Sequence, residues 1–147
     1  MEYALLLLQV WTWQAGGFVF APLIIIPISS QNDRGQFQIL VSCYDFSLYS
    51  LSINEESKVS VLWKTRLGGR LGSAAFPFNI RTSSGIDNIC AAICSSIGEL
   101  YIVNLQDGEI HGCYNVKSEV FSSPVVHKDR IYFGSRDNNM YNLRMQF

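Results

Sequence analysis

Short runs of β-branched and aromatic residues, separated by polar turns, recur along the chain and are clearest in residues 119–143. Three such runs are divided there by polar turns at Asp129-Arg130 and at Asn138-Asn139. Asn tolerates a left-handed backbone, so it suits a tight hairpin turn. The pattern predicts an antiparallel three-stranded meander. Helical periodicity is essentially missing throughout, so we expect an all-β fold.

The same unit occurs twice more upstream. The first two of three tyrosines in matching contexts are 101 − 49 = 52 residues apart, and the last two are 141 − 101 = 40 apart. The residue eight positions before each tyrosine is apolar, and an aspartate lies four positions before the first and the third. These markers are Tyr49, Tyr101 and Tyr141, then Val41, Ile93 and Phe133, then Asp45 and Asp137.

Two further markers share the first interval. The same 52 residues separate Trp11 from Trp63 and Gly16-Gly17 from Gly68-Gly69. The second interval is shorter because the connection over residues 79–88 has only residues 128–129 as its counterpart. A period of 40 to 52 residues with about four strands per unit is typical of a propeller blade.

We therefore predict a partial β-propeller of three consecutive four-stranded antiparallel blades. The expected blades cover residues 16–67, 68–117 and 118–147, and the last lacks its fourth strand. Three blades are too few for a ring, because natural propellers carry about four to eight. The expected strands cover residues 18–26, 36–43, 48–53 and 59–65 of the first blade, and residues 71–78, 89–94, 100–105 and 109–115 of the second.

Prolines mark the start of two blades. Pro22 interrupts the apolar run 18–26, where proline is awkward for a central strand. It recurs as Pro124, so we expect both prolines to mark the strand edge that faces the central channel.

Residues 3–13 form an apolar run with three interpretations. Trp11 aligns with Trp63, so residues 1–15 are predicted to be the outer strand of a preceding blade. A signal peptide is the alternative, although Glu2 precedes the run and no Lys or Arg does. An arbitrary start from a wrong gene model is the third. The run is too short to span a membrane.

Composition and cysteine spacing narrow the function classes. Hydrophobic residues make up 48% of the 147 residues, which excludes general disorder, and a net charge of −1 disfavours nucleic-acid and membrane partners. No CxxC pair occurs, and Cys90 and Cys94 would lie roughly 13 Å apart on one strand, too far for a disulfide. Reduced thiols of a cytoplasmic protein are expected, with no metal, because His111 and His127 lack ligand spacing.

One part of the repeat resembles a known family. The segment Tyr101-Ile102-Val103-Asn104, followed by Asp107-Gly108-Glu109-Ile110, resembles the repeat of quinoprotein-like (PQQ-like) propellers. In that family a closing Trp docks one blade on the next. Trp63 matches this Trp, whereas Gly112 stands where the second unit should carry it, which implies weaker docking there.

A second resemblance covers residues 61–143. Gly98-Glu99-Leu100-Tyr101, residues 119–126 and residues 134–138 with Tyr141 resemble the C-terminal propeller of the beta-alanine-activating enzymes. That family of acyl-CoA-synthetase-like adenylating enzymes combines an adenylation domain, a carrier domain and a propeller. Neither the phosphate-gripping loop nor the Ser-bearing carrier motif has a match here. The resemblance implies that any activity would lie on sequence absent from this chain.

No catalytic, cofactor or metal site is predicted. Asp45 and Asp137 are expected to cap turns through their side chains. Quinone enzymes use an adjacent Cys-Cys pair, which the sequence lacks, and no Ser, His and acid arrangement has usable spacing. We expect a non-catalytic scaffold or interaction module whose partners are other blades, adenylation and carrier domains, or another protein. A quinone-dependent dehydrogenase fragment and a secreted or luminal sensor are the alternatives.

Stacking on neighbouring blades is what stabilises a blade. A three-blade piece should expose apolar faces at both ends. We therefore expect the isolated chain to be marginally stable or to self-associate.

Overall fold

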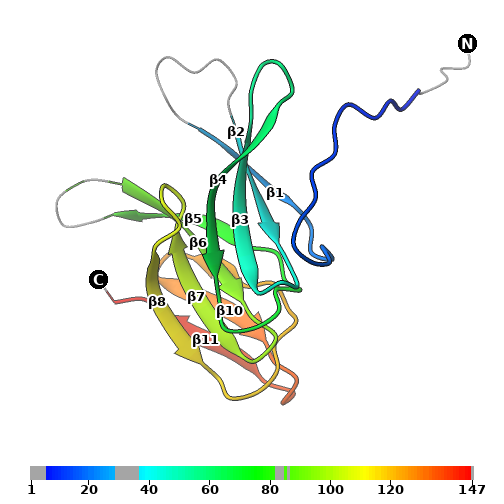
Figure 1. The fold of residues 1–147 in the computed structure, drawn as a ribbon. Helices are drawn as coiled ribbons and strands as arrows, with labels where there is room; N and C mark the ends of the chain where they lie inside the picture. The colour runs from blue at the N-terminus through cyan, green and yellow to red at the C-terminus, as the bar shows by residue number, and fades with distance from the viewer. Residues whose placement is uncertain (1–5, 29–36, 82–84, 86, 147) are drawn as a thin grey trace, which may run out of the picture.

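The described residues form only strands and their connections. The structure is a computed structural model that describes residues 6–28, 37–81, 85 and 87–146. Within these residues eleven strands form three antiparallel sheets and no helix occurs (Figure 1). The predicted all-β class is therefore confirmed.

Each sheet is a meander in which strands adjacent in sequence are hydrogen-bonded neighbours. The first sheet contains β1 (Ile24–Pro27), β2 (Phe37–Ser42), β3 (Ser47–Ile53) and β4 (Val59–Arg66). The second contains β5 (Phe76–Arg81), β6 (Asp87–Cys94), β7 (Glu99–Asn104) and β8 (Ile110–Asn115). The third contains β9 (Val125–His127), β10 (Arg130–Gly134) and β11 (Met140–Arg144).

The three sheets share one register around the repeated tyrosines. Each tyrosine lies directly opposite the apolar residue eight positions before it, in the pairs Val41 with Tyr49, Ile93 with Tyr101 and Phe133 with Tyr141. The first hairpin is longer in the second sheet than in the third. Its strands β5 and β6 remain paired as far as Arg81 and Asp87, whereas β9 and β10 are joined by Lys128 and Asp129 alone. That difference accounts for most of the shorter second interval between the tyrosines. The rest comes from the β7–β8 hairpin, since Gly112 follows Tyr101 by 11 residues whereas the equivalent Trp63 follows Tyr49 by 14.

The second sheet lies between the other two, with an apolar cluster on each face. Along β6, Ala91 and Ile93 belong to the cluster shared with the first sheet, and Ala92 and Cys94 to the cluster shared with the third. Successive side chains on a strand point to opposite faces, so this run must be apolar throughout. All four residues are fully buried.

The first strands of the first two sheets are shorter or later than predicted. β1 covers Ile24–Pro27 rather than the predicted residues 18–26, and β5 begins at Phe76 rather than at residue 71. The preceding segments hydrogen-bond elsewhere: the amide of Tyr44 donates to the Phe18 carbonyl, and the amide of Leu71 to the Cys43 carbonyl. Their backbone groups therefore link neighbouring parts of the chain instead of extending a ladder.

The first turn of the third sheet also differs from the prediction. His127 pairs with Arg130, so the turn consists of Lys128 and Asp129, one residue earlier than expected. Lys128 takes a left-handed conformation with φ 55°, and Asn138 does so in the second turn with φ 67°. Arg130 cannot be a turn residue because it pairs with strands on both sides.

The outer strand predicted over residues 1–15 is not formed in its described part, residues 6–15, and residues 1–5 lie outside the described residues. This part has no strand partner; its beginning extends away from the sheets and its end returns to the first sheet (Figure 1). An outer strand needs the third strand of its own blade, and the described chain places none beside it. Trp13 instead packs edge-on against Tyr49, with ring centroids 5.0 Å apart.

Candidate functional site

The most regular polar feature is a tyrosine that donates to a carboxylate in each sheet. Tyr49 donates to Asp45 in the first sheet, and Tyr141 donates to Asp137 over 2.5 Å in the third. Both aspartates lie four residues before their tyrosine. In the second sheet Tyr101 donates to Glu99, only two residues away. The same interaction is thus made from two different sequence positions.

Glu99 was not predicted from the sequence as a member of this set. Ile97 occupies the position equivalent to Asp45, so counting four residues back from Tyr101 finds no acid. The signal was present in another form. Residues two apart on a strand share one face, so Glu99 and Tyr101 on β7 were bound to lie side by side.

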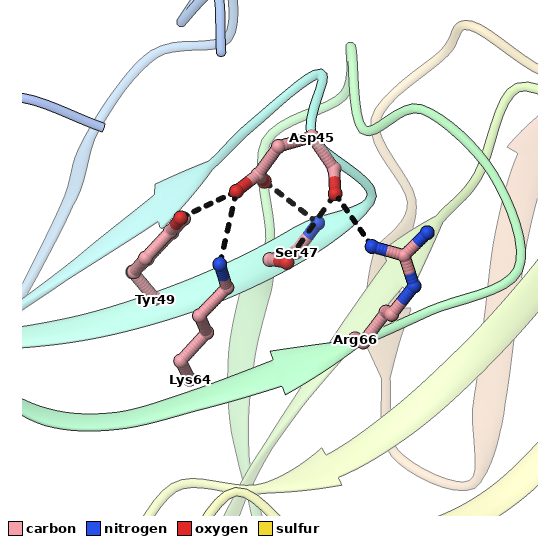
Figure 2. A network of polar contacts seen from close by, with 5 residues as sticks. All are labelled: Asp45, Ser47, Tyr49, Lys64 and Arg66. Carbon is pink, nitrogen blue, oxygen red and sulfur yellow. Dashed lines mark hydrogen bonds and ion pairs between the residues drawn. The ribbon is translucent and has the colours of Figure 1, made fainter. Parts of the chain in front are cut away.

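Asp45 holds the densest of these groups, in the turn between β2 and β3 (Figure 2). Its carboxylate accepts from Tyr49, from Lys64 Nζ at 3.2 Å and from the Ser47 amide at 3.1 Å. Its main-chain carbonyl accepts from Arg66 at 3.4 Å and from the Ser47 hydroxyl at 3.4 Å. The group therefore ties the β2–β3 turn to β4.

The ionisation of these groups argues against acid–base chemistry. Burial raises the pKa of Asp45, but hydrogen bonds from Tyr49, Cys43 and Lys64 outweigh it, so the net pKa falls below 3.8. The hydrogen bond from Tyr141 likewise lowers the pKa of Asp137. Burial, followed by the Glu99 hydrogen bond, raises the pKa of Tyr101. A general base or acid needs a pKa near the working pH, and these shifts move away from it.

The glycine pairs lie against these tyrosine–carboxylate groups, which explains their 52-residue spacing. A Cβ atom on Gly16 would collide with the Asp45 carboxylate, and one on Gly68 with the Glu99 carboxylate. The amide of Gly68 also donates to the Tyr101 hydroxyl at 3.0 Å. A side chain at either position would therefore push the carboxylate away from its tyrosine.

Trp63 joins the first sheet to the second. It is 9% exposed, and its indole N–H donates to the Leu105 carbonyl at 3.0 Å. The side-chain amide of Gln38 donates to the same carbonyl at 2.8 Å, and Thr65 donates to the Gly108 carbonyl at 2.6 Å. A Cβ on Gly108 would collide with the Trp63 ring, so this residue must be glycine as well.

The corresponding place between the second and third sheets is empty of side chain. Trp63 pairs with Ser50 and Gly112 pairs with Ile102, in each case one residue beyond the sheet's tyrosine. No heavy atom lies within 4 Å of a Cβ built on Gly112. A cavity of about 860 Å³ opens there, with Gly112 among its lining residues.

Two other predicted pairs of markers are not equivalent. Trp11 is 37% exposed and lies outside any strand, unlike Trp63. Pro124 directly precedes β9 and is buried, whereas Pro22 is exposed two residues before β1. The prediction that both prolines mark one position was wrong, because the register places them one residue apart.

The four cysteines form no disulfide with one another, and three of them are buried. All four are free thiols: Cys43, Cys90, Cys94 and Cys113. Burial raises the pKa of Cys90 to about 11 and that of Cys94 to about 12, so both are protonated at neutral pH. Thiols of this kind are poor nucleophiles and poor metal ligands.

The described part of the chain contains neither a metal-binding cluster nor a membrane-spanning helix. No three His, Cys, Asp or Glu side chains described by the structure are grouped so that they could hold a metal ion. No described helix could cross a membrane.

The fold and its repeated packing define a segment of a β-propeller. The chain is 29% identical over 115 residues to the human beta-alanine-activating enzyme and 33% identical over 79 residues to the mouse enzyme of that name. These matches cover 78% and 54% of this chain but only 10% and 7% of the relatives' lengths. No protein-family model matches the chain.

A solved structure supports the same fold. The chain resembles the crystal structure of BamB from Moraxella catarrhalis with a TM-score of 0.60. The match covers 90% of this chain and 35% of that one, at 12% sequence identity. Identity this low supports a common fold and nothing about function.

Proposed function

We propose that this chain is a non-catalytic propeller module that serves as a scaffold or interaction surface within an amino-acid-activating enzyme. The observation that carries the proposal is the match to two beta-alanine-activating enzymes over at most a tenth of their length. A region so small relative to those proteins would be one module among several. The repeated tyrosine–carboxylate groups support a structural role, because those of Asp45 and Asp137 hold the turns between strands in place.

The finer parts of the proposal follow from the resemblance. The module would be built from quinoprotein-like repeats and would occupy the C-terminal part of its enzyme, beside adenylation and carrier domains. It would use no quinone or other cofactor. The buried, protonated thiols of Cys90 and Cys94 support a reducing, cytoplasmic location.

An antibody raised against residues 118–147 tests this proposal on the native protein. We expect a band several times heavier than 16.6 kDa, the mass of this chain. The immunoprecipitate should catalyse exchange of pyrophosphate into ATP that depends on β-alanine, and the recombinant 147-residue chain should not. A band only at 16.6 kDa, without exchange activity, would contradict the link to an activating enzyme.

The isolated chain offers a second check. We expect it to be marginally stable alone or to self-associate, because its outer blade faces lack neighbours. A sharp monomeric peak in size-exclusion chromatography together with a cooperative melt would contradict this.

A further inference from the structure

The two inter-sheet interfaces can be compared position by position. The amide of Leu105 donates to the Ile89 carbonyl at 2.9 Å, and the amide of Met145 donates to the Asp129 carbonyl at 2.8 Å. Leu105 follows Tyr101 by four residues and Met145 follows Tyr141 by four. Met145 is therefore the counterpart of Leu105.

Both side chains that donate to the Leu105 carbonyl are replaced in the second interface. Gly112 stands for Trp63, and Cys90, which pairs with Asn104, stands for Gln38, which pairs with Ser52. Glycine has no side chain and a thiol is a weak donor. These two positions therefore supply the Met145 carbonyl with no donor comparable to the Trp63 indole and the Gln38 amide, which bond to Leu105. One acceptor has thus lost both of its donors together.

The space left by the missing indole is large and mainly apolar. The cavity of about 860 Å³ is lined from the second sheet by Leu100 and Ile102 and from the third by Ile131 and Leu143, with Gly112 and Met145 beside them. Small-molecule sites typically measure about 300–1,000 Å³ and combine apolar walls with a few polar groups. The cavity has that size and character.

We propose that this cavity binds a small molecule with an indole-like ring, planar, aromatic and bearing one N–H donor. The template is within the protein: in the neighbouring interface the Trp63 ring fills the equivalent place and donates to Leu105. The ligand ring lies between the second and third sheets and donates its N–H to the Met145 carbonyl. The remaining volume accommodates a substituent on the ring. This inference is independent of the proposed enzyme context.

Calorimetric titration of the 147-residue chain with indole is the first test. Indene has the same shape but no N–H donor. We expect indole to bind and indene to bind about two- to tenfold more weakly, the usual effect of one hydrogen bond. Absence of indole binding at millimolar concentration would overturn the proposal, and so would equal affinity for both rings.

Variants at Gly112 locate the binding. Gly112→Trp should fill the cavity and abolish indole binding, whereas Gly112→Ala, the matched control, should keep the affinity within about twofold. A folded Gly112→Trp chain that binds indole as tightly as the original would overturn the proposal.

A spectroscopic readout covers the case in which Gly112→Trp fails to fold. Ile102, Ile131 and Leu143 line the cavity, so their methyl resonances report on its contents. On addition of indole to the original chain they should shift more than the methyl resonances of Ile39 and Leu51, which lie in the cluster on the far face of the first sheet. Shifts confined to that far cluster would place the ligand elsewhere and overturn the proposal.

Discussion

The interface between the first and second sheets is closed by an indole ring, and the interface between the second and third is not. Trp63 is buried with its N–H on Leu105, whereas the equivalent Gly112 faces a cavity. Both interfaces nevertheless keep an apolar cluster, and all three sheets keep the same register around their tyrosine. Strand pairing within a sheet and docking between sheets are therefore separate properties of this fold.

Other contacts hold the third sheet without a tryptophan. Val120, Ile131 and Phe133 are buried in the cluster that joins it to the second sheet. The Ser123 hydroxyl accepts from the Ala74 amide at 2.9 Å and so bridges the segments that lead into β9 and β5. These contacts make the docking residue dispensable at the second interface. They do not replace Trp63 at the first.

The largest expected effect is at Trp63. Trp63→Ala should destabilise the chain by about 3–5 kcal/mol, because it leaves a cavity and removes a donor from a buried carbonyl. Urea unfolding followed by circular dichroism measures this, and a chain of low stability would simply lose its transition. Gly112→Ala, the control at the equivalent position, should change the stability by less than about 0.5 kcal/mol. Equal effects of the two substitutions would abolish the distinction between the interfaces.

The tyrosine–carboxylate groups should differ with their burial. Tyr101 is 8% exposed, so Tyr101→Phe removes a donor from a carboxylate in a sheltered place and should cost about 1.5–3 kcal/mol. Tyr141 lies in the less buried third sheet, so Tyr141→Phe should cost about 1 kcal/mol or less. Unfolding curves of both variants give the comparison. A larger loss for Tyr141→Phe would show that burial does not set the strength of these groups.

Acid should weaken the β2–β3 turn. The folded pKa of Asp45 is below its unfolded value of 3.8, so its contribution is complete above that value and is lost as the pH falls through the folded pKa. Stability measured between pH 7 and pH 2 should therefore fall less steeply in Asp45→Asn than in the original chain. Identical slopes would mean that the Tyr49 and Lys64 contacts do not favour the charged carboxylate.

The smallest effect should come from the exposed pair at the edge of the third sheet. Arg136 lies 2.9 Å from Glu119, with side chains 66% and 58% exposed. Glu119→Gln should change the stability by about 0–0.5 kcal/mol, and added salt should remove the difference. A loss above about 1 kcal/mol would show that this pair, rather than the apolar cluster, holds the third sheet.

The repeat could be predicted from the sequence because its signals are local. The tyrosines, the apolar residues opposite them and the turns at Asn138 and Gly108 follow from period-two alternation and turn chemistry. Glu99 was missed for a local reason as well, since the acid of the second sheet lies on the strand rather than in the turn. The tyrosine–carboxylate hydrogen bond is the same in this sheet, and only the number of residues between the acid and the tyrosine differs.

Other features depend on contacts that the sequence does not display. A strand begins where its partner offers a ladder, so β1 starts at Ile24 although the apolar run begins at residue 18. Residues 6–15 have strand character but no partner beside them. The acceptor for Trp63 lies 42 residues further along the chain. The sequence showed that Gly112 stands where the repeat has a Trp, but the cavity beside Gly112 could not be predicted.

The indole N–H groups test the central claim most directly, because the chain contains only three tryptophans. In ¹H–¹⁵N spectra recorded after transfer to D₂O, one indole signal should persist while the other two disappear quickly. That signal should be missing in Trp63→Phe, since only Trp63 is buried with its N–H bonded to Leu105. Three indole signals that exchange equally fast would contradict the docking of the first sheet on the second.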